Sequence, residues 1–194
     1  MNMTMQILTR QRSRSAPEAV LTGPIAFMHG RVHELCGPAR RTLAVMIAGQ
    51  LEGPILWIRP SWNRDRLCAD GVVSWLNPAR IVFLDARSLE DIQWCTEEAL
   101  RSGEAPVVIT EFPEPPSLTP IRRQHLAAQV ASHPALALLL TPEDGGAQGV
   151  ETRWHMAGTH GPGQRSWQLT RLRARMAPPA SWALHDRDGV LEAA

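Results

Sequence analysis

The sequence has no lysine and no tyrosine, and all 20 of its basic residues are arginine. Without lysine the chain cannot form a lysine Schiff base, use a lysine as a general base, or supply the lysine of a standard phosphate-binding P-loop. Cysteine is scarce: Cys36, Cys68 and Cys95 are odd in number, widely spaced and outside any CxxC pair. That pattern argues against a disulfide framework or a zinc site, so we expect reduced thiols.

Long apolar runs are missing as well. Those present are broken by proline or charge and are far shorter than the roughly 20 residues that span a bilayer, and the N-terminus lacks the apolar core of a signal peptide. We therefore expect a cytoplasmic protein that does not contact a membrane. The 194 residues, 44% hydrophobic and 20% charged, are enough for one ordinary domain, and the formal net charge of +1 leaves the partner open.

The first 24 residues are polar, carry three arginines and end in Thr22-Gly23-Pro24. This composition predicts that residues 1–24 form a flexible N-terminal extension and that residues 25–194 form a single domain. Within the domain, short apolar runs alternate with stretches of helical period, which is typical of an α/β fold. The apolar runs are residues 32–36, 55–58, 81–84, 107–110 and 135–140. Most are continuously apolar, which predicts central strands of a parallel sheet covered by helices.

Helical period is clearest in two stretches between these runs. The apolar stripes are Leu43, Met46, Ile47 and Leu51 in the first, and Leu89, Ile92 and Ala99, interrupted by Thr96, in the second. Ser88 and Gly103 are the start and stop signals of the second helix, and Thr119-Pro120 predicts a third helix that reaches about residue 132. After Pro142, short strands are expected at residues 153–156, 167–173 and 182–185, as an antiparallel addition at one sheet edge.

Ligands of open α/β sheets bind beyond the carboxyl ends of the strands. The residues at those positions are Gly37, Arg59, Asp85, Glu111 and Thr141. The turn at residues 37–42 lies where a phosphate loop would lie, but it lacks the second glycine and the lysine and reaches its threonine two residues early. The chain therefore has a vestigial phosphate loop, and we expect no nucleotide or other cofactor. Its residues are Gly37, Arg40, Arg41 and Thr42, with Glu111 at the end of a neighbouring strand.

Glu111 ends its strand where an acidic residue would hold Mg²⁺ or orient water. Without a working phosphate loop, an ion pair with a neighbouring arginine is the simpler interpretation, and the same holds for Asp85. His29, His33 and Glu34 could suggest a metal site, but two histidines four residues apart converge only on a helix, and this segment is a predicted strand. No nucleophile motif is present, so we predict neither a metal site nor a catalytic residue.

Arginines cluster late in the chain. Arg171, Arg173 and Arg175 alternate along a predicted strand, so three guanidiniums would project from one face. Such a strip could contact DNA phosphates or an acidic partner segment, or it could face only water. Arg122-Arg123 lies near a predicted helix N-terminus, where positive charge is unfavourable, and this hints at an anionic neighbour.

Several segments together resemble the ImuA family, which consists of RecA-like, damage-inducible mutagenesis accessory proteins. The segments are residues 30–44, 53–58, 76–80, 94–103 and 152–154, and residues 172–179 also resemble a late core strand and the following loop of RecA. The resemblance covers about residues 28 to 185. It implies a three-layer RecA-like core with a mostly parallel central sheet.

The resemblance also implies partners: an ImuB-like pseudo-polymerase and an error-prone DnaE-type polymerase that act in translesion synthesis, with RecA or DNA as further possibilities. Our leading hypothesis is a non-catalytic accessory protein of the bacterial SOS response. Two alternatives stay open, because fold does not determine function. One is a cell-division inhibitor of the SulA type, and the other is a weak RecA-type ATPase that uses Arg41, Thr42 and Glu111.

Overall fold

Strands outnumber helices among the described residues. The computed structural model describes residues 18–187 and 190–194. Their strands are β1 (Glu18–Thr22), β2 (Ile25–Met28), β3 (Val32–Cys36), β4 (Ile55–Pro60), β5 (Ile81–Ala86), β6 (Val107–Glu111), β7 (Leu136–Leu140), β8 (Thr152–Gly158), β9 (Arg165–Ala174), β10 (Ala180–Arg187) and β11 (Val190–Ala193). Their helices are α1 (Arg40–Gly49), α2 (Ala69–Val72), α3 (Leu89–Ser102) and α4 (Leu118–Val130), with a 3-10 turn at Pro78–Arg80.

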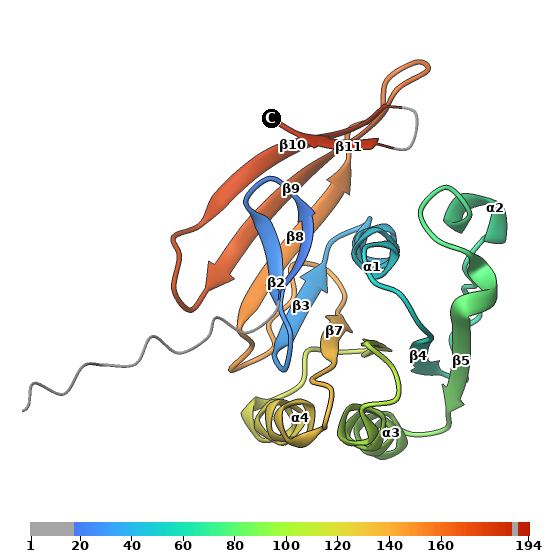
Figure 1. Ribbon diagram of the computed structural model, residues 1–194, viewed down its shortest axis with the longest axis vertical. Helices are drawn as coiled ribbons and strands as arrows, with labels where there is room; N and C mark the ends of the chain where they lie inside the picture. The colour runs from blue at the N-terminus through green and yellow to red at the C-terminus, as the bar shows by residue number, and fades with distance from the viewer. Residues whose placement is uncertain (1–17, 188–189) are drawn as a thin grey trace, which may run out of the picture.

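One large sheet organises these elements (Figure 1). Among the described residues it has nine strands, in the order β11-β10-β9-β8-β3-β7-β6-β4-β5. The strands from β8 to β5 pair in parallel, and β9, β10 and β11 continue the sheet in antiparallel pairing. The α/β class, the mostly parallel sheet and the antiparallel C-terminal addition predicted from the sequence are therefore confirmed.

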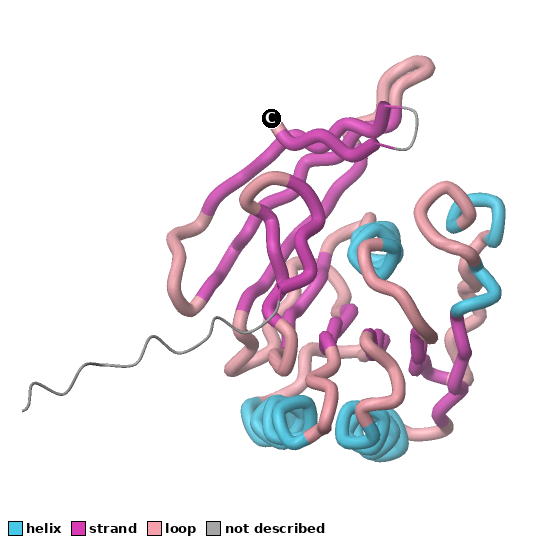
Figure 2. The backbone as a smooth tube through the Cα atoms, viewed as in Figure 1, coloured by secondary structure: helices cyan, strands magenta, loops and turns pink. Residues whose placement is uncertain are grey.

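Helices cover both faces of the parallel part (Figure 2). On one face α1 and the β1–β2 hairpin bury one apolar cluster against the sheet, and on the other face α3 and α4 bury a second cluster. Strands β3, β6 and β7 are buried along their whole length. Their predominantly apolar sequences follow from this, because both faces of each strand lie against other elements.

The helix signals in the sequence fall close to the observed ends. The Ser88 side chain accepts a hydrogen bond from the backbone N–H of Asp91 at 3.0 Å, and Gly103 ends α3 with a positive φ of 67°. The predicted start of α4 at Thr119 is corrected to Leu118, with Ser117 as the N-cap residue. Proline at the third helical position still costs no hydrogen bond, because the first backbone N–H groups of a helix have no intrahelical partner.

Two predictions are wrong: where the domain begins, and the position of one strand in the sheet. Ala19 and Leu21 of β1 are buried in the first apolar cluster, so the core begins before residue 25 and takes in part of the predicted extension. Gly23-Pro24 is the turn of a β1–β2 hairpin instead of the end of a linker. The rest of that extension, residues 1–17, lies outside the described residues.

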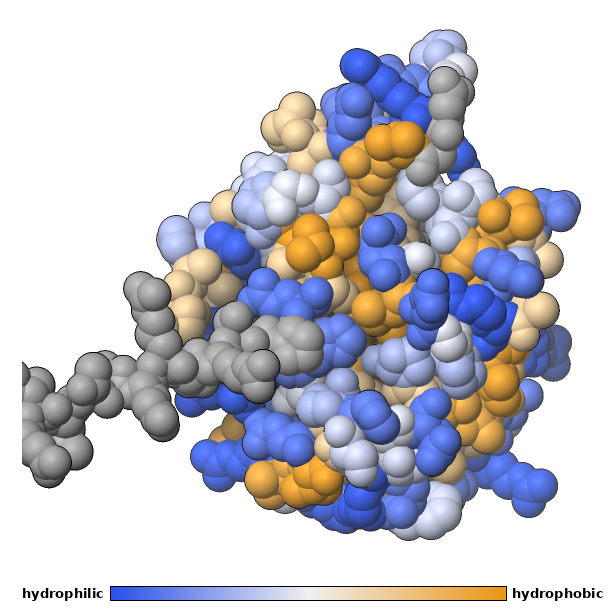
Figure 3. All heavy atoms as spheres, viewed as in Figure 1, coloured by the Kyte–Doolittle hydropathy of each residue, from blue (hydrophilic) through white to orange (hydrophobic). Residues whose placement is uncertain are grey.

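The second correction concerns β5, which we predicted to be a central strand. Among the strands that the structure describes it pairs with β4 alone, and it forms the outer edge of the sheet. Its Val82, Phe83 and Leu84 are 48%, 39% and 38% exposed, and Figure 3 shows hydrophobic residues at the surface in this region. An apolar run reports the hydrophobicity of a strand but not whether a second strand pairs with it.

Candidate functional site

The turn between β3 and α1 is held by backbone hydrogen bonds to the rest of the protein. The N–H of Gly37 donates to the carbonyl of Glu143 at 2.8 Å, and the N–H of Ala39 donates to the carbonyl of Met156 at 3.0 Å. Gly37 has a φ of 84°, and a Cβ there would lie 2.7 Å from the His155 ring. The glycine thus permits close packing against β8, and two backbone donors that a phosphate loop would offer to a ligand are already used.

Beside this turn, Arg41 and Glu111 form a bidentate ion pair. Arg41 donates from Nε to Oε1 at 3.1 Å and from Nη2 to Oε2 at 2.6 Å. Trp57 Nε1 donates to Oε1 at 2.8 Å, and Asn63 Nδ2 donates to Oε2 at 3.3 Å. Both carboxylate oxygens therefore accept hydrogen bonds from the protein, and Glu111 is only 8% exposed. The interpretation of Glu111 as an acidic strand end paired with a neighbouring arginine is confirmed.

The other residues of the vestigial loop line different cavities. Arg40 folds back to donate from Nη1 to the carbonyl of Gly37 at 3.1 Å, and it lines a cavity of about 340 Å³ together with Glu111. Thr42 does not line that cavity. It lies with Arg41 at a smaller one of about 170 Å³, on the side of α1 that faces α2, and it also lines a cavity of about 490 Å³ beside Trp75. The threonine is therefore not at the cavity that Glu111 borders, although a nucleotide site would need both.

Asp85 forms the second strand-end pair. Arg59 Nε donates to its Oδ1 at 2.6 Å, between neighbouring residues of the β4–β5 ladder. The hydrogen bond from Arg59 lowers the pKa of Asp85 below its ordinary value. The same guanidinium lies over the Phe83 ring, 4.3 Å from its centroid. The ion-pair interpretation is confirmed for Asp85 as well.

Glu34 carries a third network, which the sequence analysis missed. It is fully buried in β3, and its Oε1 accepts hydrogen bonds from the Thr141 hydroxyl and from the backbone N–H groups of Gly146 and Ala147 at 2.7 to 2.9 Å. Its Oε2 pairs with Arg153. A carboxylate in a buried strand was the available signal, because buried charge is stable only when it is paired.

The histidines weighed as metal ligands have other contacts. His33 Nε2 lies 3.0 Å from the Met28 carbonyl, and its Nδ1 lies 2.7 Å from the Thr152 hydroxyl. Burial lowers the pKa of His33 to about 4, so the ring is neutral near pH 7. His29 Nδ1 lies 3.1 Å from the Pro134 carbonyl. Each ring therefore has a hydrogen-bond partner in another segment of the chain.

The predicted arginine strip is interrupted by a β-bulge. Arg153 pairs with Arg173, but the next residue of β8, Trp154, pairs with Arg171. One extra residue, Leu172, therefore lies in β9 between the two arginines. A bulge of this kind shifts the alternation of side chains between the faces of the sheet. The prediction that Arg171, Arg173 and Arg175 project from one face is therefore wrong.

The three arginines have different surroundings as a result. Arg171 lies over the rings of Trp154 and Trp182, 5.6 Å and 5.3 Å from their centroids, and donates two hydrogen bonds to the Pro178 carbonyl. Arg173 and Arg175 instead line a cavity next to α4. Arg171 stabilises the packing of β9 on its neighbours, whereas the other two remain available for a ligand.

Arg122 and Arg123 also have different partners. Arg123 Nη2 forms an ion pair at 2.8 Å with Glu97 of α3, which is the anionic neighbour that the sequence hinted at. Arg122 lines the same cavity as Arg173 and Arg175. No sequence signal indicated that Arg122 would meet the other two, because it lies about 50 residues before them.

Comparison with known proteins does not assign the chain to a family. No protein-family model matches the chain, and no curated protein is significantly similar to it. Within the part of the chain that the structure describes, no helix has both the length and the apolar character needed to cross a bilayer. A functional proposal therefore depends on the resemblance of the sequence segments to the ImuA family and on the geometry of two regions. These are the turn beside Arg41 and the cavity lined by Arg122, Arg173 and Arg175.

Proposed function

We propose that the chain is a non-catalytic, RecA-like accessory protein of the ImuA type, which acts in bacterial DNA-damage-induced mutagenesis by binding other proteins. Its partners are an ImuB-like pseudo-polymerase and an error-prone DnaE-type polymerase, with RecA or DNA as further candidates. The mostly parallel sheet between helices and its antiparallel C-terminal edge are compatible with a RecA-like core.

The observation that carries this proposal is the ion pair at the carboxyl ends of the strands. A RecA-type ATPase needs free backbone donors for the phosphates and a free acidic side chain for Mg²⁺ or water. Here Gly37 and Ala39 donate within the protein, and both oxygens of Glu111 accept hydrogen bonds from neighbouring side chains. This arrangement supports a structural role for the region and argues against the weak-ATPase alternative.

The outer edge of β5 supports a protein-binding role. An edge strand has unpaired backbone donors and acceptors, and soluble proteins usually protect such edges with charge, proline or a covering element. In β5 three consecutive apolar residues are more than a third exposed: Val82, Phe83 and Leu84. A partner strand or loop that covers this edge would bury them, and strand addition is a common mode of peptide recognition.

A pull-down tests this proposal. We expect the full chain to retain an ImuB-like protein at micromolar concentration, and Val82→Glu to weaken the binding by placing a charge at the interface. Val20→Glu is the matched control, because Val20 is a similarly exposed strand valine, 52% against 48%. Equal binding by the two variants would contradict the role of β5. Binding of neither polymerase partner, with or without DNA, would contradict the proposed function.

A further inference from the structure

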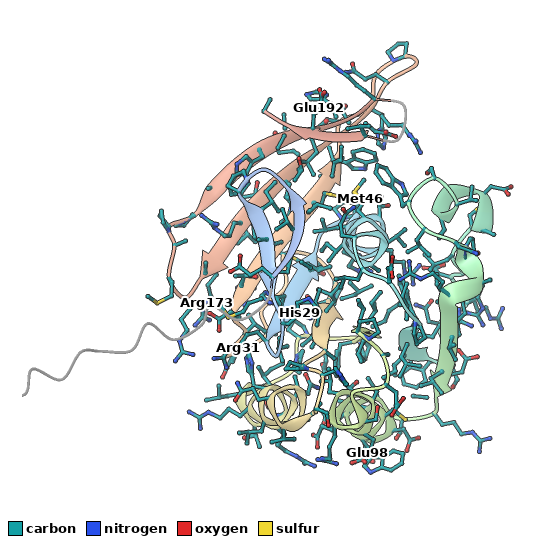
Figure 4. All side chains as sticks on the ribbon, in the orientation of Figure 1. His29, Arg31, Met46, Glu98, Arg173 and Glu192 are labelled. Carbon is teal, nitrogen blue, oxygen red and sulfur yellow. The ribbon has the colours of Figure 1, made fainter. Side chains whose placement is uncertain are left out.

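A basic cavity lies between α4 and the amino-terminal ends of β3 and β8. It has a volume of about 480 Å³, and four arginines and one histidine line it: Arg31, Arg122, Arg173, Arg175 and His125. Figure 4 shows Arg31 and Arg173 at the end of the sheet next to α4. These residues come from three separate segments, so the cavity is produced by the fold and not by one charged stretch of sequence.

Three of these arginines have no anionic partner among residues 18–187 and 190–194. The ion pair in the cavity joins Arg31 Nε to Glu151 at 3.7 Å, and no described carboxylate pairs with Arg122, Arg173 or Arg175. Several arginines elsewhere contact carboxylates closely: Arg41–Glu111, Arg59–Asp85, Arg123–Glu97, Arg153–Glu34 and Arg165–Asp186. Other arginines without a described carboxylate partner, such as Arg40, Arg80 and Arg171, donate to backbone carbonyls instead. In this cavity three arginines without a carboxylate partner line one space.

A histidine of the lining lies close to the same arginine charges. His125 Nε2 lies 3.1 Å from the Gly149 carbonyl, so the ring is fixed at the wall. Burial lowers the pKa of His125, and the charges of Arg31 and Arg175 lower it further, although Glu151 opposes them. A bound anion would offset the repulsion between the arginines and would make protonation of this ring easier.

The lining favours a particular class of anion. Guanidinium groups donate two parallel hydrogen bonds to phosphate oxygens, and several of them together fit a group with more than one phosphate. Neither tryptophan nor phenylalanine lines the cavity, so it lacks the aromatic platform on which single-stranded nucleic acids stack their bases. Its volume is in the range of small-molecule sites. We propose that this cavity binds a compact polyphosphate group of a small molecule.

Calorimetric titration of the full chain with pyrophosphate, without Mg²⁺ and at low ionic strength, tests this proposal. We expect saturable binding that is weakened at least about tenfold in Arg173→Ala/Arg175→Ala, because two of the charge-assisted contacts are lost. The control is Arg101→Ala/Arg187→Ala, which removes the same charge from exposed surface pairs and should bind like the wild type. Unfolding curves establish that both variants fold.

Three results would overturn the proposal. One is the absence of saturable pyrophosphate binding to the wild type. Another is equal weakening in the cavity variant and the control, which would indicate a general charge effect. The third is binding of a single-stranded oligonucleotide through Arg173 and Arg175 that pyrophosphate does not displace, which would assign the cavity to a nucleic-acid backbone. The proposed protein partners do not enter this experiment, so its failure would leave the pull-down result unaffected.

Discussion

Two regions of the molecule hold arginines in opposite states. At the carboxyl ends of the strands, Arg41 is neutralised by Glu111 and fixed by two hydrogen bonds. In the cavity beside α4, Arg122, Arg173 and Arg175 have no described carboxylate as a partner. The first region lies where a nucleotide would bind in this class of sheet, and the second does not. Position in the fold alone therefore does not identify a binding site. Whether the charged side chains there are already paired within the protein must be considered as well.

We expect the largest loss of stability when the ion pair between Arg41 and Glu111 is removed. Glu111→Ala leaves the half-buried Arg41 guanidinium and the buried Trp57 Nε1–H without their acceptor, and we expect a loss of about 3 kcal/mol in the free energy of unfolding. Urea unfolding measures it. The control is Glu114→Ala in the exposed loop that follows, which should cost less than about 0.5 kcal/mol. A loss below about 1 kcal/mol for Glu111→Ala would mean that the ion pair acts like an ordinary surface pair.

The second prediction concerns how stability changes with pH through His33. This residue lies in β3, the strand that runs from the basic cavity to the turn at Gly37. His33 has a pKa of about 4 in the folded protein against an ordinary value of 6.5, so the unfolded chain takes up the proton more readily between these pH values. Stability therefore falls as the pH falls through this window, by about 2 kcal/mol from pH 7 to pH 5.

Unfolding curves measured across this pH range check the effect. His33→Gln removes the titrating group and keeps a hydrogen-bonding side chain, so its stability should change less with pH than that of the wild type. An unchanged pH dependence in this variant would show that the acid response comes from other groups.

The smallest effects separate Arg171 of β9 from Arg175, which directly follows that strand. Arg171→Ala removes stacking on two tryptophan rings and two hydrogen bonds to a carbonyl, with an expected loss of about 1 kcal/mol. Arg175→Ala should change stability by less than about 0.5 kcal/mol, because this side chain is exposed and unpaired with the described acidic residues. Thermal unfolding of the two variants in parallel makes the comparison. Equal losses would contradict the different roles assigned to the two residues.

Much of the paired region could be predicted from the sequence. Strands that run parallel end at one edge, so the positions of Gly37, Glu111 and Asp85 at the ends of apolar runs were enough to bring them to that edge. The absence of lysine and of the second loop glycine then indicated an ion pair in place of a phosphate site. Arg41 and Glu111 are 70 residues apart, and only the topological rule relates them.

The basic cavity could not be predicted in the same way. Period-two spacing put Arg171, Arg173 and Arg175 on one face, but a single extra residue at Leu172 shifted the alternation, and no sequence signal marks that bulge. The meeting of Arg31 with Arg122 and Arg173 depends on how α4 packs against the ends of β3 and β9. Such packing is a tertiary property that local spacing does not contain.

Titration of Mg-ATP into Arg173→Ala/Arg175→Ala shows whether the turn at Gly37 binds a nucleotide, because this variant disables the basic cavity and leaves the turn intact. With its backbone donors and Glu111 engaged inside the protein, the turn should give no saturable heat of binding at millimolar nucleotide. Saturable binding that disappears when Thr42→Ala is added would place a nucleotide at the turn and would show that the turn is not closed.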